Sequence, residues 1–377
     1  MKRLICFFIC FILMLPCAIV SADEEIEGVD AKACILIEQS TGNTLLEMNA
    51  DDELPIASVT KIMTMLLIME QIDSGALTFD TMIPVSENAM SYGGSTMFLE
   101  AGEELSVNDM LKGIAVASAN DGCVAMAEYI AGSESTFVDM MNKKAEELGM
   151  SHTHFANTNG LDDDNHYSSA RDVSIMSREL LRHPEITNYT SIWTDELRGG
   201  KFQLANTNRL IRFYSGANGL KTGSTSKALC CLSAAAKRDN MQLIGVVLGA
   251  PTSDKRFESA KSLLDYGFAN YGIKQLAEEG EEIADAPISG GTAETVKAVT
   301  AEGKSVLLKK SDGTEPERRV YINENITAPV KAGDTIGELQ FADGEDIIEK
   351  TELKAAADVP KKGIGKIMRD IALGFIS

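Results

Sequence analysis

The chain is organised around the stretch PIASVTKIMTMLLIMEQ, residues 55–71. Proline is tolerated just before a helix but not inside one, so we predict that a helix begins near Ala57. From Ile62 to Met69 the side chains are hydrophobic nearly all round, which is typical of a helix buried in the middle of a domain. The sequence therefore predicts a central, buried helix.

Ser58 and Lys61 stand in the first turn of this predicted helix, on one face because they are three residues apart. A lysine buried there loses its hydration without structural gain, and this loss lowers the pKa of its amine. A neutral amine beside a hydroxyl can take the hydroxyl proton and so activate the serine as a nucleophile. The alternative is a serine that caps the helix and a lysine that reaches solvent, because S-x-x-K is a short pattern with many chance matches.

The first 22 residues have the pattern of a secretory signal peptide. Lys2 and Arg3 precede an apolar run over residues 4–15, and small residues precede the acidic segment that begins at Asp23. The apolar run is too short to span a membrane as a helix. We therefore expect cleavage after Ala22 and export of the protein.

The composition argues against nucleic acid and metal as partners. The chain of 377 residues has a net charge of −21, and without the two basic residues of the signal peptide the remainder is more acidic still. Such acidity disfavours binding to nucleic acid. Beyond the signal peptide the cysteines lack the spacing of a metal site, so we expect small, buried, unpaired thiols. They are Cys34, Cys123, Cys230 and Cys231.

The pattern along residues 23–277 predicts an α+β domain. Its first predicted element is a β-hairpin, followed by helices, then by strands and one more helix. The ranges are 31–48 for the hairpin, 107–181 for the helical part, 228–236 and 243–248 for strands, and 255–271 for the last helix. This order predicts an antiparallel sheet covered by helices, with the two ends of the domain meeting in the sheet.

The composition changes near Glu278. From residue 278 to 359 the sequence is charged, rich in glycine and threonine, and alternates in short segments such as ETVKAVTA and RRVYINENI. Short strands with evenly spaced turns predict a small, separate all-β domain.

Residues 360–377 have the pattern of a basic amphipathic helix, with apolar residues on one helical face and basic residues off it. The apolar set is Ile364, Ile367, Met368, Ile371 and Phe375, and the basic set is Lys361, Lys362, Lys366 and Arg369. On an acidic protein this pattern is typical of a helix that lies in a membrane interface. We expect it to hold the exported protein on the outer face of the cytoplasmic membrane; the alternative is a helix packed on the β domain.

Two further motifs supply what a serine acylation site needs besides a nucleophile and a base. Ser118-Ala119-Asn120 lies in a predicted break between helical segments and offers a second hydroxyl and an amide. Lys221-Thr222-Gly223 opens a predicted strand and offers a cation and a hydroxyl beside a glycine, where a substrate backbone can lie close. Each motif is weak alone, but the three in this order are typical of the active-site serine penicillin-binding enzymes and β-lactamases.

The resemblance goes further than these motifs. The sequence resembles a low-molecular-mass penicillin-binding protein, a serine-type D-alanyl-D-alanine carboxypeptidase of the peptidase S11 family, over nearly all of residues 31–271. The matching stretches are PIASVTKIMT, GGSTMFLEAG, ASANDGCVAMAEYIAG, FANTNGLDDDNHYSSARD, TNRLI, NGLKTGSTSKA and LIGVVLGAPTSDKRFESAKSLLDYGF. The resemblance implies a β-lactamase/transpeptidase-like domain, and the later β domain and terminal helix match the layout of that family.

The resemblance also implies roles for the residues of the three motifs. Ser58 would be the acylated nucleophile, Lys61 its base, and Ser118 a proton relay to the leaving group. The substrate-binding residues would be Asn120, Lys221, Thr222, Gly223 and Ser224. The backbone N–H groups of Ser58 and Ser224 would form the oxyanion hole. No metal and no cofactor is implied.

We therefore expect hydrolysis of the terminal D-Ala from D-Ala-D-Ala peptidoglycan stem peptides through a serine acyl-enzyme, with β-lactams as covalent inhibitors. One alternative is a β-lactamase-like hydrolase. Three features argue against it: the S-A-N motif, the lack of an obvious loop with a deacylating glutamate, and the added β domain. Another is a catalytically silent cell-wall binding protein. A silent protein would have no reason to keep the side chains of Ser58, Lys61, Ser118 and Lys221 together.

A few positions depart from the family or remain open. The family usually has glycine where this chain has Leu229, which affects the packing of a strand behind the site, and Ala119 is a common alternative to glycine. Arg256 stands where the family has an arginine near the site, and it either binds a substrate carboxylate or is a solvated helix residue. We interpret His166, although it lies in a matched stretch, as structural.

Overall fold

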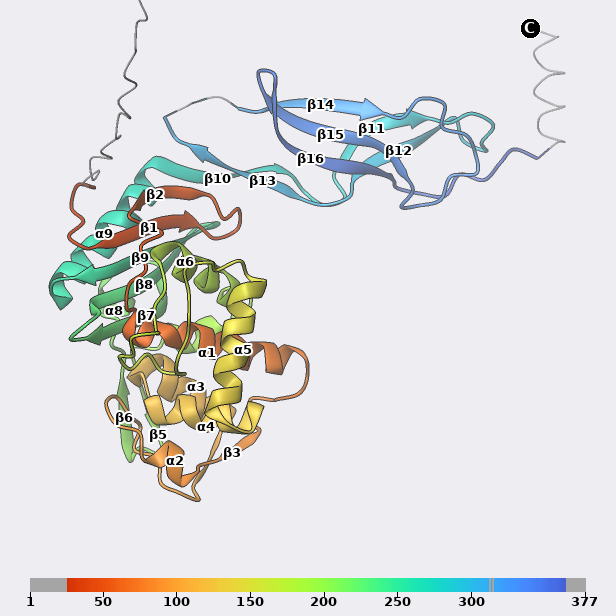
Figure 1. Cartoon of the computed structure of the whole chain (residues 1–377). Coiled ribbons are helices and arrows are strands. Elements are labelled where there is room, and N and C mark those ends of the chain that lie inside the picture. The colour runs from red at the N-terminus through yellow and green to blue at the C-terminus, as the bar shows by residue number, and fades with distance from the viewer. Residues whose placement is uncertain (1–25, 312, 314, 364–377) are drawn as a thin grey trace, which may run out of the picture.

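The computed structural model describes residues 26–311, 313 and 315–363. The predicted signal peptide, and residues 364–377 of the predicted terminal helix, lie outside these described residues. The described chain forms a sheet-and-helix domain and a small all-β domain, connected through a long two-stranded ribbon (Figure 1). The predicted α+β fold class is confirmed.

The sheet of the first domain has five antiparallel strands in the order β2-β1-β9-β8-β7. Their bounds are Ala33–Glu38 for β1, Thr44–Met48 for β2, Ala217–Thr225 for β7, Leu229–Arg238 for β8 and Met241–Ala250 for β9. Because β1 pairs with β9, the start and the end of the domain meet in the sheet as predicted. β7 carries the Lys221-Thr222-Gly223 motif and is an edge strand of this sheet.

Helices cover both faces of the sheet (Figure 1). α9 (Ser253–Asn270) packs on one face through a core that includes Leu36, Leu243 and Leu264. The opposite face packs on α1 (Lys61–Asp73) and α6 (Ala170–Leu180) through a larger core. The other helices are α2 (Glu87–Met90), α3 (Val107–Lys112), α4 (Asn120–Ala131), α5 (Glu134–Glu147), α7 (Thr187–Thr190) and α8 (Leu210–Phe213). Two small two-stranded antiparallel sheets pair β3 (Met82–Pro84) with β4 (Glu104–Ser106) and β5 (Thr194–Leu197) with β6 (Phe202–Ala205).

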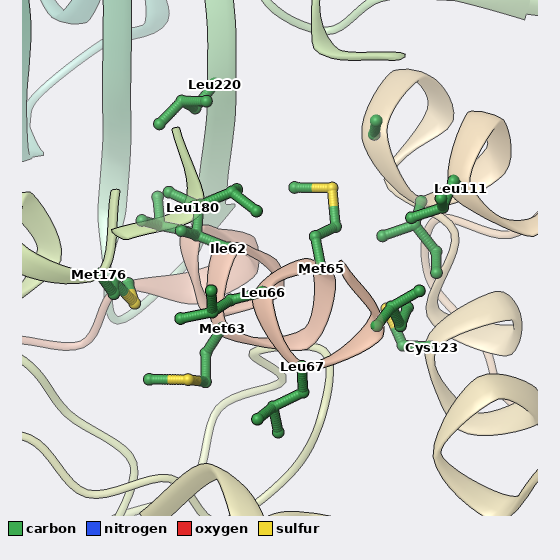
Figure 2. Close-up of a cluster of buried hydrophobic side chains, with 14 of the residues drawn as sticks. Ile62, Met63, Met65, Leu66, Leu67, Leu111, Cys123, Met176, Leu180 and Leu220 are labelled. Carbon is green, nitrogen blue, oxygen red and sulfur yellow. The ribbon is translucent and has the colours of Figure 1, made fainter. Parts of the chain in front are cut away.

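α1 is the centre of the larger core. Every side chain from Ile62 to Met69 is at most 3 % exposed. Figure 2 shows these side chains leaving the helix in several directions, some towards Leu180 and Met176 of α6 and others towards Leu111 and Cys123. The prediction of a central, buried helix is confirmed.

The start of this helix differs from the prediction. The α-helix begins at Lys61, and Ala57–Thr60 form a 3-10 turn in front of it. Side chains at positions i and i+3 eclipse each other in a 3-10 helix. The 3-10 turn therefore aligns the Ser58 side chain with that of Lys61 more closely than the predicted α-helix would.

The β domain has a core of its own, which includes Leu339, Phe341 and Leu353. β10 (Tyr271–Ala277) follows α9 directly and pairs with β13 (Lys304–Lys309). A five-stranded antiparallel sheet has the order β11-β12-β16-β15-β14. Its strands are β11 (Glu282–Pro287), β12 (Thr295–Thr300), β14 (Glu317–Ile322), β15 (Thr335–Asp343) and β16 (Asp346–Ala355). The boundary after residue 277 stays a prediction, since β10 already pairs with a strand beyond it.

The described residues of the predicted terminal helix, 360–363, are extended chain rather than helix. The Pro360 carbonyl accepts a hydrogen bond from the Thr292 N–H, and the Lys362 N–H donates to the Gly290 carbonyl. These backbone groups are paired with the β domain, so they do not begin a helix. None of the helices in the described ranges is long and apolar enough to cross a membrane.

Leu229 begins β8 with a φ of 58°, in the left-handed region. This conformation costs a residue with a Cβ atom about 1–2 kcal/mol relative to its ordinary conformations. The leucine side chain is only half-buried and belongs to neither apolar core of this domain. The strain at Leu229 is therefore not repaid by core packing.

We expect Leu229→Gly to raise the free energy of unfolding by about 1 kcal/mol, because glycine adopts a positive φ without steric cost. Chemical denaturation measures this change. Ala236→Gly in the same strand, where φ is not left-handed, is the control and should lower stability by roughly 0.5–1 kcal/mol. A loss of stability in Leu229→Gly would contradict the assigned strain.

Candidate active site

Ser58 and Lys61 form a hydrogen-bonded pair at the start of the buried helix. The Lys61 amine lies 2.9 Å from the Ser58 Oγ. Lys61 is fully buried, whereas Ser58 is half-buried and so remains accessible from one side. A serine with a lysine amine at this distance has the geometry of a nucleophile and its base.

Two other groups hold the Lys61 amine in place. It donates to the Asn120 Oδ1 and to the Asn159 backbone carbonyl, each at 2.7 Å. Burial lowers the pKa of Lys61 from 10.5 to about 8, although nearby Cys123 and Asp121 oppose part of this shift. About one molecule in ten therefore carries the neutral amine at pH 7. The lowered pKa agrees with the sequence-based prediction.

Ser118 and Asn120 lie where the chain turns between two helical segments, as predicted. A π-helical turn over Gly113–Ala117 ends at Ser118, whose φ of 63° is left-handed, and α4 then begins at Asn120. Strained conformations of this kind cluster at functional sites. The Asn120 Nδ2 donates to the Gly93 carbonyl at 2.8 Å, so the amide is oriented with its oxygen towards Lys61.

Lys221, Thr222 and Gly223 lie on the edge strand β7, beside the 3-10 turn that carries Ser58. A Cβ atom on Gly223 would lie 2.5 Å from the Ile56 carbonyl and 3.0 Å from the Ser58 nitrogen, so only glycine fits there. Lys221 is buried, and its pKa is lowered by desolvation and by the nearby charge of Lys61. The Ser224 Oγ donates to the Leu229 carbonyl at 3.0 Å, so its side chain is bound to the neighbouring strand. The motif thus places the Gly223 backbone next to Ser58, whereas the Lys221 amine donates to the Thr222 carbonyl at 3.0 Å and lies within electrostatic reach of Lys61.

Residues 155–168, which we call the site loop, contact three parts of the site. These are the 3-10 turn Ala57–Thr60, which we call the nucleophile turn, the Lys61 amine, and the end of β7. The loop supplies the Asn159 carbonyl to Lys61, and the Thr225 hydroxyl donates to Asp162 at 2.6 Å. Within the loop, Gly160 has a φ of 87° and packs closely on the Ala57 carbonyl. A Cβ atom on Gly160 would lie 1.9 Å from that oxygen. The site loop therefore fixes one side of the candidate active site.

Arg256 supports the site from behind the sheet. Arg256 is only 6 % exposed, which rules out the interpretation of Arg256 as a solvated helix residue. The guanidinium donates to the backbone carbonyls of Gly223 and Cys231, at 3.1 and 3.3 Å. Arg256 thus connects α9 with β7 and β8, and this geometry supports a structural role for it.

Several residues that build the site were not predicted from the sequence. The Asn159 carbonyl was not predicted, because every residue carries a carbonyl and only the fold shows which one reaches Lys61. Thr207, whose hydroxyl lies 2.6 Å from that of Thr222, was also missed. Both stand in stretches that match the family, FANTNG and TNRLI, and this match was the available signal.

Two expectations about side-chain chemistry concern cysteine and metal. The four cysteines in the described residues are free, and all but the half-buried Cys230 are buried, as expected. Across residues 26–363, apart from 312 and 314, no group of three or more His, Cys, Asp or Glu side chains is arranged to hold a metal ion.

Two family models match the chain. Residues 19–252 match the D-alanyl-D-alanine carboxypeptidase family, peptidase S11, and residues 271–361 match the C-terminal domain of penicillin-binding protein 5. The chain is 44% identical to the D-alanyl-D-alanine carboxypeptidase DacF of Bacillus subtilis, over 89% of this chain and 87% of that protein.

Solved structures agree with these matches. Penicillin-binding protein 5 of Haemophilus influenzae has a TM-score of 0.74 and 32% identity, covering 88% of this chain and 98% of that one. Penicillin-binding protein D2 of Listeria monocytogenes, solved in an ampicillin-bound form, has a TM-score of 0.59 and 32% identity, covering 65% of this chain and 100% of that one. On these grounds the chain belongs to the peptidase S11 family of D-alanyl-D-alanine carboxypeptidases.

Proposed function

We propose that this protein removes the terminal D-Ala from D-Ala-D-Ala stem peptides of peptidoglycan through an acyl-enzyme on Ser58. The observation that carries the proposal is the buried Lys61 amine, held 2.9 Å from the Ser58 hydroxyl by Asn120 and the Asn159 carbonyl. Membership of the D-alanyl-D-alanine carboxypeptidase family supports the substrate. A silent binding protein is disfavoured because it would gain nothing from burying a lysine beside a serine.

In the acylation step the neutral Lys61 amine accepts the Ser58 proton, and the Ser58 Oγ attacks the carbonyl carbon of the penultimate D-Ala. The N–H groups of Ser58 and Ser224 stabilise the negative charge that develops on the carbonyl oxygen. Ser118 and Lys221 pass a proton to the nitrogen of the departing D-Ala as the C–N bond breaks. Water then hydrolyses the ester on Ser58 and releases the shortened peptide.

The order of groups along β7 orients the substrate. The terminal carboxylate is an anion and is bound by Lys221 and Thr222, whereas the attacked carbonyl lies at Gly223, next to Ser58. The anion also favours the charged form of Lys221, whose pKa is lowered by burial. The rest of the stem peptide then extends past Ser224 along the free edge of β7.

We also propose that the protein acts outside the cytoplasm, after removal of residues 1–22, and is held on the outer face of the membrane by residues 361–377. The action of the family on peptidoglycan supports an extracytoplasmic function. The described chain ends at the β domain, where residues 360–362 pair with residues 290–292, away from α9 and the first domain (Figure 1). In this arrangement the β domain separates Ser58 from the membrane surface.

The acyl-enzyme is tested with penicillin and intact-protein mass spectrometry. We expect a stable adduct of one penicillin on Ser58, absent in Ser58→Ala. Lys61→Arg keeps the charge but cannot lose its proton, so its acylation rate should fall by about 10²–10⁴-fold, the usual contribution of a general base. Lys143→Arg, at an exposed position on α5, is the matched control. An adduct on another residue, or rapid turnover without any adduct, would sink the assignment.

The lowered pKa of Lys61 predicts how acylation depends on pH. Only the neutral amine accepts the serine proton, and its pKa is about 8. The acylation rate should therefore rise about tenfold per pH unit up to that value and level off above it. Stopped-flow measurements with a fluorescent penicillin follow this rate. A rate that is constant between pH 6 and pH 8, roughly two units over which the neutral fraction changes most steeply, would exclude Lys61 as the base.

The membrane proposal is tested by ending the chain after Gly363, which retains the described pairing on the β domain. The truncated protein should stay active but fail to sediment with anionic vesicles that the full mature chain binds. Lys366→Glu with Arg369→Glu is a full-length control and should weaken sedimentation with anionic vesicles in particular. Sedimentation of the truncated protein would refute the anchor.

A further inference from the structure

A directed chain of hydrogen bonds connects the site loop with the nucleophile turn. The Ala156 N–H donates to the His166 Nδ1 at 3.1 Å, so this nitrogen is an acceptor without a proton. The proton of the neutral ring therefore lies on Nε2, which donates to the Thr60 Oγ1 at 2.7 Å. The Thr60 hydroxyl in turn donates to the Ala57 carbonyl at 2.7 Å. Each bond in this chain has a defined donor and acceptor, so the hydrogen bonds all run from the Ala156 N–H towards the Ala57 carbonyl.

This chain ends at the peptide group that joins Ala57 to Ser58. A peptide group is planar, so the Ala57 carbonyl and the Ser58 N–H point in opposite directions from one rigid unit. Ala57 has a left-handed φ of 48°, which an alanine does not adopt without support from its surroundings. The support comes from the Thr60 hydroxyl and from Gly160, which packs directly on the same carbonyl oxygen.

We propose that His166 is a positioning residue that holds the Ser58 N–H in the orientation of an oxyanion donor, acting through Thr60 and the Ala57 carbonyl. The proposal rests on the proposed function, which makes this N–H part of the oxyanion hole. His166 does not touch the reacting atoms. Its effect falls on the step in which negative charge develops on the carbonyl oxygen, and not on the initial binding of the ligand.

The surroundings of His166 keep its ring neutral. The side chain is 4 % exposed and packs edge-on against Phe155. Burial lowers the pKa of His166 to about 4; the charged groups that face it are Asp163 and Asp162, which oppose the shift, and His154 and Lys61, which add to it. Protonation would place a proton on Nδ1, opposite the Ala156 N–H, and replace a hydrogen bond with two facing donors. The chain is therefore intact over the pH range in which Lys61 becomes active.

The experiment measures acylation of the full mature protein by a fluorescent penicillin, separating the dissociation constant from the limiting acylation rate. His166→Leu removes both bonds of the ring, whereas His166→Gln keeps one acceptor and one donor. Thr60→Val and Thr60→Ser form a second pair that removes or keeps the relaying hydroxyl. His154→Gln is the control, because His154 directly precedes the site loop and is exposed, and its ring bonds the Asn165 carbonyl and no member of the chain.

We expect His166→Leu and Thr60→Val to lower the limiting acylation rate by about tenfold or more, with the dissociation constant within about twofold of wild type. His166→Gln, Thr60→Ser and His154→Gln should stay within about threefold in rate. The double variant of His166→Leu and Thr60→Val should be no slower than either single variant, because both break one chain. If His166→Leu does not fold, the Thr60 pair carries the same comparison.

Three results would overturn the proposal. They are a wild-type acylation rate in folded His166→Leu or Thr60→Val, an equal loss in His166→Gln and His166→Leu, and a loss confined to the dissociation constant. Failure of wild type to be acylated at all would instead refute the proposed function. The two failures are therefore distinguishable.

Acid pH provides an independent readout. The ratio of the acylation rates of wild type and His166→Gln should be constant at neutral pH and fall as the pH approaches about 4, because only the histidine can be protonated there. Circular dichroism at each pH confirms that both proteins remain folded. A ratio that stays constant through the pH range in which the His166 ring is seen to titrate by NMR would show that protonation of His166 does not reach the nucleophile turn, and would overturn the proposal.

Discussion

The Lys61 amine is buried next to the Ser58 hydroxyl, and the surrounding elements are arranged to hold it there. Lys61 is the first residue of a helix that is apolar on every side, so its amine cannot reach solvent. An isolated buried charge is costly, and the fold meets this cost by lowering the pKa and by supplying polar partners from Asn120 and Asn159. The same burial that makes lysine unusual at this position lowers its pKa towards the range that the proposed role as a base requires.

Close backbone approach is the second condition of the site. Gly223 of β7 and Gly160 of the site loop both pack against the turn that carries Ser58, at distances that exclude a Cβ atom. Ala57 and Ser118 adopt left-handed conformations at the two turns that carry the proposed catalytic groups. Packed cores transmit such constraints because they hold few alternative arrangements. The large apolar core around α1 thus gives the strained turns a rigid support (Figure 2).

The two domains have separate roles. The first places segments from four distant parts of the sequence around Ser58, whereas the second has its own core and meets the first through the end of α9 and the β10–β13 ribbon (Figure 1). The site residues described here all lie in the first domain. Within the described residues, the β domain therefore contributes no residue to the site, and its role in the proposed function is to set the distance between the site and the membrane.

The sequence alone predicts the fold class, the central helix and the pairing of Ser58 with Lys61. These follow from local periodicity and from residue spacing, which a single segment carries. It also identified the Ser118 and Lys221 motifs as parts of the same site, although only through their order and through a family resemblance. The contacts between distant segments appear only in the folded structure: the Asn159 carbonyl on Lys61, the His166 ring on Thr60, and the Arg256 guanidinium behind β7. Their partners are backbone carbonyls or hydroxyls that occur throughout any sequence. Which of them meet depends on how elements far apart in the chain pack, and no local pattern records that packing.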